Sequence, residues 1–385
     1  MAGEWRPSNW GDEVTLEYGK AIRGYSRTHG KYRVFGSNGP IGWTSEPLTQ
    51  GPGVILGRKG AYRGVEFWRE PFWVIDTAYY LVPKTELDMR WIYYAVKHYK
   101  LGEVDDGSPV PSTTRAAVYM LELDVPPKEE QRAIAHILGT LDDKIELNRL
   151  RNQTLEAMAR AQFKDWFVDF GPVRAKMEGR EPYLPSDLWQ LFPDRLDDES
   201  KPEGWEISKV ETILNRLSAK IRYTKDQVSS HGKTPVFEQG ASIILGFHDG
   251  DAAYQASAED PAFVFGDHTC ITKLSCQPFD ISQNVIPLRG QDRPTMWVYY
   301  AINEKQKFEE YRRHWMELIT KDLIVAPNHI CLEFSKRATG LHIQMEQNER
   351  ESYTLVQLRD TLLPKLISGE LRIKDAERFM EGVSA

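Results

Sequence analysis

The chain contains little cysteine. Three residues in 385, Cys270, Cys276 and Cys331, lie far apart and without the spacing of metal ligands. This pattern argues against a disulfide framework and a zinc site, and favours small buried apolar side chains in a reducing compartment. No segment approaches the ~18 consecutive apolar residues that span a membrane, and the N-terminus lacks the apolar run of a signal peptide. We expect a soluble, cytoplasmic protein with no membrane partner.

Motifs for covalent chemistry are also missing. The sequence has no G-x-x-x-x-G-K-[ST] phosphate loop, no G-x-G-x-x-G after a strand and no H-E-x-x-H helix. It also lacks the Asn/Asp-Pro-Pro-aromatic tetrapeptide with which amino-methyltransferases hold an extruded adenine. These absences predict no catalytic residue, no metal site and a recognition or assembly role. A fused methyltransferase or nuclease is the weaker alternative, and activity of the chain alone with S-adenosylmethionine would revive it.

Apolar residues in the middle of the chain follow alternating spacings of three and four. They are Ile134, Leu138, Leu141, Ile145, Leu155, Ala159 and Trp166, with Asn148, Asn152 and Gln162 between them. This spacing is typical of a coiled-coil seam. A helix over residues 134 to 168 would be about 50 Å long at 1.5 Å per residue.

The same stretch returns two hundred residues later, without a gap. Val125, Pro127, Leu141 and Asn148 correspond to Val325, Pro327, Leu341 and Asn348. The upstream segments repeat more loosely: "VILGRKG" at 54–60 answers "FVFGDHT" at 263–269, and "WIYYAVK" at 91–97 answers "WVYYAIN" at 297–303. An internal repeat of this kind predicts two similar halves, and the second copy supplies a partner for the central helix.

The predicted fold is therefore α+β, with two similar mixed α/β domains separated by two long helices. The helices pair as an antiparallel coiled coil, which gives the chain an internal pseudo-twofold symmetry. The boundaries are 1–124 for the first domain, 125–170 for the first helix region, 171–204 for a Pro-rich acidic linker with about one helical turn, 205–322 for the second domain, 323–373 for the second helix region and 374–385 for the tail. The aromatics of "WIYYA" and "WVYYA" are expected in the domain cores.

The net charge of −7 at first argues against nucleic acid, but its distribution is uneven. Lys and Arg outnumber Asp and Glu over residues 18–100, whereas acids outnumber bases over 126–200. The N-terminal third could therefore face a polyanion, although uneven surface charge is common.

The run "VPPKEEQRAIAHILGTLDDKIELNRLRNQTLEAMARAQFKDWFVDFGPVRAKMEG", with the later "TLVQLRDTLLPKLISGEL", resembles the specificity subunit of type I restriction-modification systems. The resemblance implies that each mixed domain is a target recognition domain for one half of a bipartite double-stranded DNA sequence. It also implies a non-catalytic chain that binds no cofactor and docks two methyltransferase subunits. Those subunits carry the S-adenosylmethionine and adenine-N6 methylation, and hold restriction and motor subunits. The second copy departs from the pattern, because Ala326-Pro327-Asn328-His329-Ile330-Cys331 replaces Pro126-Pro127-Lys128-Glu129-Glu130-Gln131. Equal docking at both halves is thereby in doubt.

Candidate DNA-binding residues lie on Gly-rich and aromatic loops. In the first domain they are Lys20, Arg23, Arg27, Lys31, Arg33, Asn38, Arg58, Lys59 and Arg63, and in the second Lys220, Arg222, Lys225, Lys233, Gln239 and His268. Arg58 and Asn38 are the best base readers, since Arg pairs with guanine and Asn with adenine, whereas the others suit phosphates. Nearby acids, Asp267 among them, either face away from phosphate or read a cytosine amino group. For each candidate the alternative is a solvated surface charge, and for the whole chain it is a coiled-coil assembly adaptor without direct DNA readout.

Four residues of the long helices receive more specific predictions. Asn148 and Asn348 are expected at equivalent seam positions, where a polar residue fixes helix register; the alternative is that both face solvent at a bend. Trp166 and Phe167 are candidates for docking a partner subunit, although core packing is the favoured role.

Overall fold

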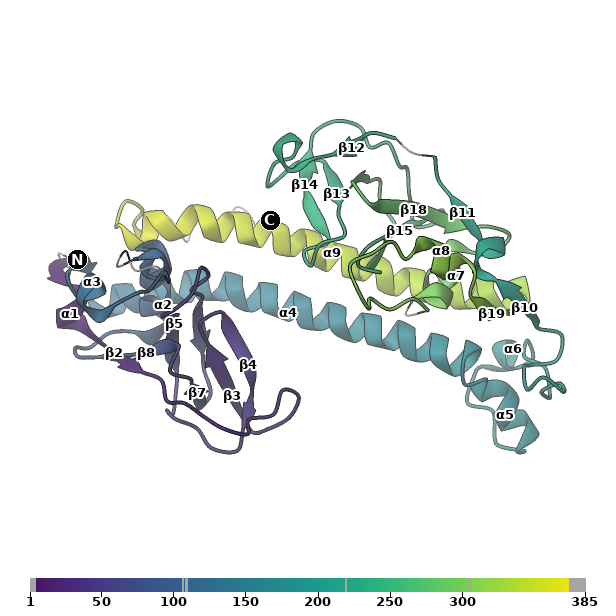
Figure 1. Cartoon of the computed structure of the whole chain (residues 1–385), viewed down its shortest axis with the longest axis horizontal. Helices are drawn as coiled ribbons and strands as arrows, with labels where there is room; N and C mark the ends of the chain where they lie inside the picture. The colour runs from purple at the N-terminus through teal and green to yellow at the C-terminus, as the bar shows by residue number, and fades with distance from the viewer. Residues whose placement is uncertain (1–4, 106, 108–109, 219, 304, 374–385) are drawn as a thin grey trace. The chain divides into compact units, whose positions relative to one another are not determined.

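The computed structural model describes residues 5–105, 107, 110–218, 220–303 and 305–373 (Figure 1). The chain divides into two compact units, Met1–Leu147 with Ser352–Ala385, and Asn148–Glu351. Each unit contains one mixed α/β domain and a part of each long helix. In the ranges described, no helix is long and apolar enough to cross a membrane.

The first unit contains three sheets. The largest is antiparallel with strand order β2-β8-β5-β6, formed by Val14–Tyr18, Ala78–Pro83, Gly53–Gly57 and Val65–Trp68. A second sheet has the order β4-β3-β7, formed by Gly39–Thr44, Tyr32–Gly36 and Phe72–Val74, with β3 and β7 parallel. β1 (Arg6–Asn9) pairs with β9 (Glu122–Val125). The short helices are α1 (Trp10–Glu13), α2 (Met89–His98), η1 (Leu101–Glu103) and α3 (Arg115–Tyr119).

The second unit repeats this plan. Its antiparallel sheet has the order β11-β18-β15-β16, formed by Leu214–Arg216, Val285–Gly290, Ala262–Gly266 and Thr272–Ser275. The next sheet, β12-β17-β13-β14, is formed by Arg222–Tyr223, Asp280–Ser282, Thr234–Phe237 and Ile244–His248. β10 (Glu206–Lys209) pairs with β19 (Asp322–Val325). The short helices are η2 (Val210–Ile213), η3 (Lys225–Gln227), α7 (Thr295–Ile302) and α8 (Trp315–Ile319).

The two strand orders correspond element by element, with β12 as an addition in the second unit. β5 and β15 are the central strands, and every residue of both is buried. Such strands read as continuous apolar runs because both faces are covered. One face is covered by α2 in the first unit and by α7 in the second. The predicted internal repeat and the mixed α/β class are confirmed.

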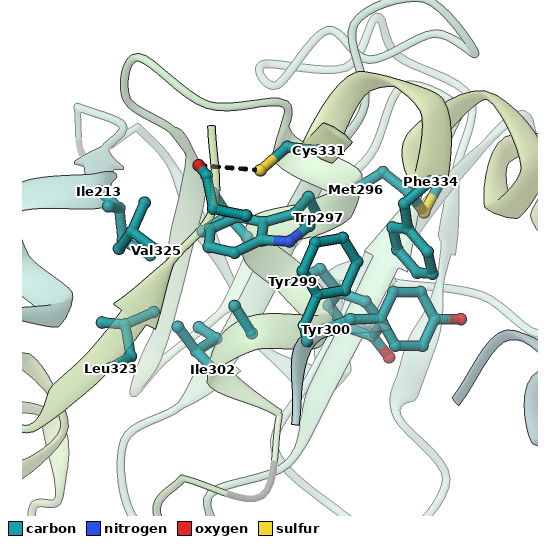
Figure 2. Close-up of a cluster of buried hydrophobic side chains, with 14 of the residues drawn as sticks. Ile213, Met296, Trp297, Tyr299, Tyr300, Ile302, Leu323, Val325, Cys331 and Phe334 are labelled. Carbon is teal, nitrogen blue, oxygen red and sulfur yellow. Dashed lines mark hydrogen bonds between the residues drawn. The ribbon is translucent and has the colours of Figure 1, made fainter. Parts of the chain in front are cut away.

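The "WIYYA" and "WVYYA" segments form α2 and α7, and most of their aromatics are buried as predicted. Figure 2 shows Trp297, Tyr299 and Tyr300 of α7 gathered with Phe334 and Cys331 of the second long helix. Burial raises the pKa of the Cys331 thiol to about 12. This cysteine therefore behaves as a small apolar core residue.

The two long helices are α4 (Lys128–Phe167) and α9 (Asn328–Ile367), each of 40 residues and each beginning one residue after a proline. In the first unit, Leu138 of α4 shares a core cluster with Leu362 of α9. In the second, Nδ2 of Asn152 donates to the carbonyl of Met345 at 2.9 Å. Later residues of α4 meet earlier residues of α9, so the pairing is antiparallel within each unit, as the seam predicted.

The segment predicted as a linker, 171–204, is more ordered than expected. It contains two helices, α5 (Gly171–Met177) and α6 (Ser186–Trp189), rather than one turn. Val173, Leu188 and Phe192 are buried in the core of the second unit. The Pro and acid content suggested a linker, but these spaced apolar residues anchor the segment to the core.

Candidate nucleic-acid interface

Loops at one end of the first domain bring together two predicted base readers. We call this the first loop cluster: residues 37–38, 58–64, 75–77 and 111–115. The Thr77 carbonyl accepts hydrogen bonds from the Ser37 hydroxyl at 2.6 Å and from the Arg58 backbone N–H at 2.9 Å. Asn38, next to Ser37, and Lys59, next to Arg58, are exposed. The cluster thus places Asn38, Arg58 and Lys59 on neighbouring loops.

The remaining arginine of this loop has a structural role. Arg63 donates to three backbone carbonyls: Nε to Gly102 at 2.6 Å, Nη1 to Gly60 at 3.1 Å and Nη2 to Val104 at 3.3 Å. These bonds use the planar fork of the guanidinium to brace the loop. The geometry therefore favours loop bracing over phosphate contact for Arg63.

Five other candidates lie away from this cluster. Arg27 and Lys31 are exposed on the loop between β2 and β3. Arg33 is the second residue of β3, and its Cζ lies 4.6 Å from the Trp43 ring centroid. These residues flank the start of β3, whereas Asn38 follows its end. Lys20 and Arg23 are exposed at the start of the same loop. Exposed cations spread along a loop suit phosphate contacts, which carry no sequence information.

The equivalent loops of the second domain have different chemistry. The backbone N–H of His268 donates to Oε1 of Gln239 at 3.0 Å, so these two candidates are neighbours. The His268 ring lies 4.8 Å from the ring of Tyr311, whose side chain is 72% exposed. We call residues 239–240, 267–269 and 311–315 the second loop cluster.

Asp267 has a structural role there. It corresponds to Arg58 in the repeat, and its Oδ1 accepts from the backbone N–H groups of His314 at 3.1 Å and Trp315 at 3.0 Å. A carboxylate that caps the first turn of a helix, here α8, is favourably placed. The capping bonds explain why an acid lies next to candidate DNA-binding residues, and they favour the first of the two alternatives predicted for it.

The other four candidates of the second domain are not grouped with Gln239 and His268. Nη1 of Arg222 donates to the carbonyls of Ser282 and Val285, both at 2.9 Å. Lys233 pairs with Asp251 at 2.9 Å. Lys220 and Lys225 are exposed. Arg222 therefore ties β12 to its neighbours, and the lysines keep the character of surface charges.

Sequence reasoning missed several residues that lie in or beside these clusters. Tyr18 and Arg115 pack beside Arg58 in the first domain, and Tyr311 and Arg313 lie beside His268 and Asp267 in the second. Arg115 and Arg58 are far apart in the chain, so only the fold brings them together. A short aromatic and basic run, "YRRHW" at 311–315, was the one available sign in the second domain.

Each domain is fixed to the long helices by a tyrosine at the same place. The Tyr94 hydroxyl donates to Oδ2 of Asp142 at 2.6 Å, and the Tyr300 hydroxyl lies 2.7 Å from Nε2 of His342. Asp142 and His342 are equivalent in the repeat. Tyr300 also donates to Oε2 of Glu156 at 3.1 Å. Burial first, and then the nearby carboxylates, raise the pKa of both tyrosines, so both hydroxyls keep their protons.

In the first unit, Asp142 and its neighbour Asp143 also hold arginines. Asp142 pairs with Arg359 of α9 at 2.7 Å. Asp143 accepts from Arg90 of α2 and from Arg69, each at 2.6 Å. The hydrogen bond from Arg90 is the main reason that the pKa of Asp143 lies below its ordinary value. These carboxylates join the domain to the helix pair.

The asparagines lie in the seam between the helices. Asn148 is 1% exposed, and its Nδ2 donates to the Asn348 carbonyl at 3.3 Å and to Oε2 of Glu351 at 2.7 Å. Nδ2 of Asn348 donates to Oδ1 of Asn152 at 2.8 Å. These bonds link α4 to α9 within the second unit, so the alternative of two solvent-facing side chains does not hold. A role in setting register remains a prediction.

Trp166 and Phe167 are not placed to dock a partner through their side chains. They are 1% and 5% exposed and belong to the core of the second unit. Trp166 packs edge-on to Phe192 at 5.2 Å, and Phe167 packs edge-on to Trp297 at 5.8 Å. The docking role does not fit, and both side chains take the favoured role of core packing, because the segment after α4 folds back over these rings.

The first turn of each long helix has a side chain that donates a hydrogen bond to a backbone carbonyl just before the helix. Nε2 of Gln131 donates to the Pro126 carbonyl at 2.9 Å, and Sγ of Cys331 donates to the Ala326 carbonyl at 3.5 Å (Figure 2). Oε1 of Gln131 also accepts from the Asp88 backbone N–H at 2.8 Å. The glutamine of the first copy is therefore a buried structural residue, and a cysteine takes over one of its two contacts in the second.

Known proteins provide similar sequences and a similar fold. A family model described as "Type I restriction modification DNA specificity domain" matches residues 4–157. The type I restriction enzyme MjaIX specificity subunit of Methanocaldococcus jannaschii is 24% identical, with 77% of this chain and 72% of that protein covered. The type I restriction enzyme HindI specificity subunit of Haemophilus influenzae is 24% identical, with coverage of 71% and 74%. The crystal structure of a type I restriction-modification S subunit from M. genitalium has a similar fold, with a TM-score of 0.61, 18% identity and coverage of 94% and 96%.

Proposed function

Because this chain belongs to the family of type I restriction-modification specificity subunits, we propose that it binds double-stranded DNA and that each mixed domain reads one half of a bipartite target. The first domain reads through the first loop cluster, and the second domain through the second loop cluster. Residues Lys20, Arg23, Arg27, Lys31 and Arg33 add phosphate contacts, which supply affinity rather than sequence discrimination.

One observation supports this function most strongly. The two domains share a strand order, and each is anchored by a tyrosine hydroxyl to the equivalent helix position, Asp142 or His342. The loop clusters, in contrast, differ in charge and in aromatic content. Two domains with the same strand order and different loops are suited to recognising two different base sequences on one DNA duplex.

We infer that the helix pair sets the gap between the two half-sites of the target. Hydrogen bonds of Asn148, Asn152 and Asn348 link α4 to α9 within the second unit, and a fixed helix register would make the distance between the half-sites part of the specificity. Each base pair of error displaces a domain by about 3.4 Å along the DNA. Lengthening the helices should therefore change the gap in the target.

Specificity subunits are non-catalytic, so methylation and cleavage would come from partners. The chain would dock two methyltransferase subunits, which hold S-adenosylmethionine, and through them restriction subunits. Trp166 and Phe167 are buried, so this docking would use other surfaces. Gln131, the last residue of the helix-start motif that occurs only once, is likewise buried, and equal docking at both halves is open to test.

The test is to express the chain with its methyltransferase subunits and to map methylated adenines across the host genome. We expect one two-part sequence with a fixed gap. Insertion of the same number of residues into both helices, after Leu147 and after Glu351, should leave both half-sites unchanged and alter only the gap. Methylation without a sequence preference would contradict the proposal.

An assembly adaptor that does not touch DNA is the alternative function. The exposed Arg27 and the loop residue Arg58 separate the two. If Arg27→Ala and Arg58→Ala leave DNA affinity and its salt dependence unchanged, the adaptor gains support. If Arg27→Ala weakens binding to all sequences and lowers the salt slope by about 1, DNA contact is supported.

A further inference from the structure

Two arginines of the first loop cluster lie against one tyrosine. The ring of Tyr18, at the end of β2, is 44% exposed. Its centroid lies 4.2 Å from Cζ of Arg115 and 5.1 Å from Cζ of Arg58. Cation–π contacts of this kind restrict the rotation of long side chains at an exposed site. The three residues come from β2, the 58–64 loop and α3.

Arg115 is held in place by the backbone of β2. Its Nε donates to the Leu16 carbonyl at 2.6 Å, and the Leu16 N–H donates to the Tyr119 hydroxyl at 2.9 Å. β2 is an edge strand, so these groups of Leu16 have no strand partner on that side. Arg115 also lies 3.6 Å from the carboxylate of Glu17. Arg115 is thus bound within the protein and partly neutralised.

Arg58 differs from Arg115 in the contacts that its side chain makes. Its backbone N–H donates to the Thr77 carbonyl, and its carbonyl accepts from the Thr113 N–H, both at 2.9 Å. The side chain forms no ion pair with an acid in the part of the chain that the structure describes. It is therefore a cation with a fixed backbone whose planar group is placed by aromatic contacts. A planar fork in a defined position suits bidentate pairing with guanine O6 and N7.

We propose that Arg115 and Tyr18 are positioning residues that hold the Arg58 guanidinium for reading a guanine in one half-site. This inference rests on the proposed function and deepens it. Arg115 fixes the Tyr18 ring, and Tyr18 limits the orientations of Arg58. The guanine contact itself is made by Arg58 alone.

The second domain offers a contrast within the same chain. There Asp267 stands in the place of Arg58 and caps α8, and Cζ of Arg216 lies 5.7 Å from the Trp315 ring. Trp315 follows Arg115 by one repeat length. Among the described residues, Asp267 and not a guanidinium stands at the position of Arg58, and the nearby Arg313 lies 3.8 Å from the Asp267 carboxylate. The guanine contact through these three residues is therefore confined to the half-site of the first domain.

The experiment uses the full chain assembled with its methyltransferase subunits. Each guanine of the mapped target is replaced in turn by 7-deazaguanine, which lacks the N7 acceptor, and methylation rates are measured. We expect one guanine of the first half-site to be sensitive, with a loss of roughly tenfold to a hundredfold in the wild type. Arg58→Ala should abolish that sensitivity. Arg115→Lys, which keeps the charge but loses the planar fork, and Tyr18→Leu should remove most of it with an unchanged salt slope.

Two further variants serve as controls. Tyr18→Phe keeps the ring and should retain the sensitivity, and Arg195→Ala removes an exposed arginine that pairs with Glu203, outside both clusters. If Arg115→Lys keeps the wild-type response, or lowers the salt slope as a phosphate contact would, the positioning role is wrong. If Tyr18→Leu fails to fold, the comparison of Arg115→Lys with Tyr18→Phe tests the positioning role. Arg115→Lys should lose most of the sensitivity to 7-deazaguanine, and Tyr18→Phe should keep it. Absence of any sequence-specific methylation by the wild type would instead remove the proposed function itself.

Discussion

Nδ2 of Asn348 on α9 donates a hydrogen bond of 2.8 Å to Oδ1 of Asn152 on α4. One turn away along the pair, Asn148 donates to the Asn348 carbonyl. Three asparagines thus connect the helices where apolar residues would pack more tightly. Polar seam residues of this kind specify alignment at some cost in stability.

Replacing Asn148 and Asn348 together by leucine should raise the thermal unfolding midpoint by about 2–4 °C, because buried polar side chains are exchanged for apolar ones. The same change should loosen the register, and with it the gap of the target. Gln153→Leu is the matched control, since Gln153 is exposed on α4. A lower midpoint with an unchanged gap would refute the register role.

Tyr94→Phe should lower the free energy of unfolding by about 1.5–3 kcal/mol, because the hydroxyl bonds to the charged Asp142 in a largely buried site. Tyr93→Phe is the control. Its hydroxyl accepts from Lys97, one turn along the same helix, at 3.2 Å, and its loss should cost less. Urea unfolding measures both. Equal losses for the two variants would remove the anchoring role of Tyr94.

Acid should destabilise the second unit through His342. Burial lowers the pKa of His342 from 6.5 to about 3. Between these values the unfolded chain binds the proton and the folded chain does not, so this stability is complete above pH 6.5 and falls as the pH drops. The loss is about 1.4 kcal/mol per pH unit, or about 2 kcal/mol at pH 5.

His342→Gln tests this pH dependence. The glutamine amide can donate to the Tyr300 oxygen but does not titrate. The difference in unfolding free energy between pH 7 and pH 5 should shrink by about 2 kcal/mol in the variant. His29→Gln is the control, because His29 is exposed on the loop after β2. An unaltered pH dependence in His342→Gln would show that His342 does not carry the effect.

Gln131→Ala should destabilise the first unit by about 1–3 kcal/mol, because it leaves the buried Pro126 carbonyl and the Asp88 N–H without their partner. Glu129→Ala, at an exposed position two residues earlier, should change stability little. Chemical denaturation compares the two. If Gln131→Ala is as stable as Glu129→Ala, the motif residue serves a partner rather than the fold.

The long helices and the repeated halves could be predicted from the sequence, whereas the side-chain contacts between distant segments could not. Seam spacing and the ungapped repeat predicted both long helices, and the two "W-x-Y-Y-A" segments predicted aromatic core residues, because local sequence patterns reflect burial. Core packing of Trp166 and Phe167 was favoured from sequence, but their core neighbours Leu188 and Phe192 were not predicted, since they belong to a segment that reads as a linker. The role of Arg63 depends on carbonyls of Gly102 and Val104, which approach it only after folding.

The pairing of Asp142 with Arg359 also bears on which long helix can pair with which. In the repeat, Arg359 corresponds to Ala159. If α4 of one molecule paired with α4 of another in this same register, Asp142 would face an alanine and lose its cation. If two copies of α9 paired, Arg359 would face His342, which cannot neutralise it. The two helices look interchangeable in length and seam, but this charge pair makes α4 select α9 and disfavours the pairing of like helices from two molecules.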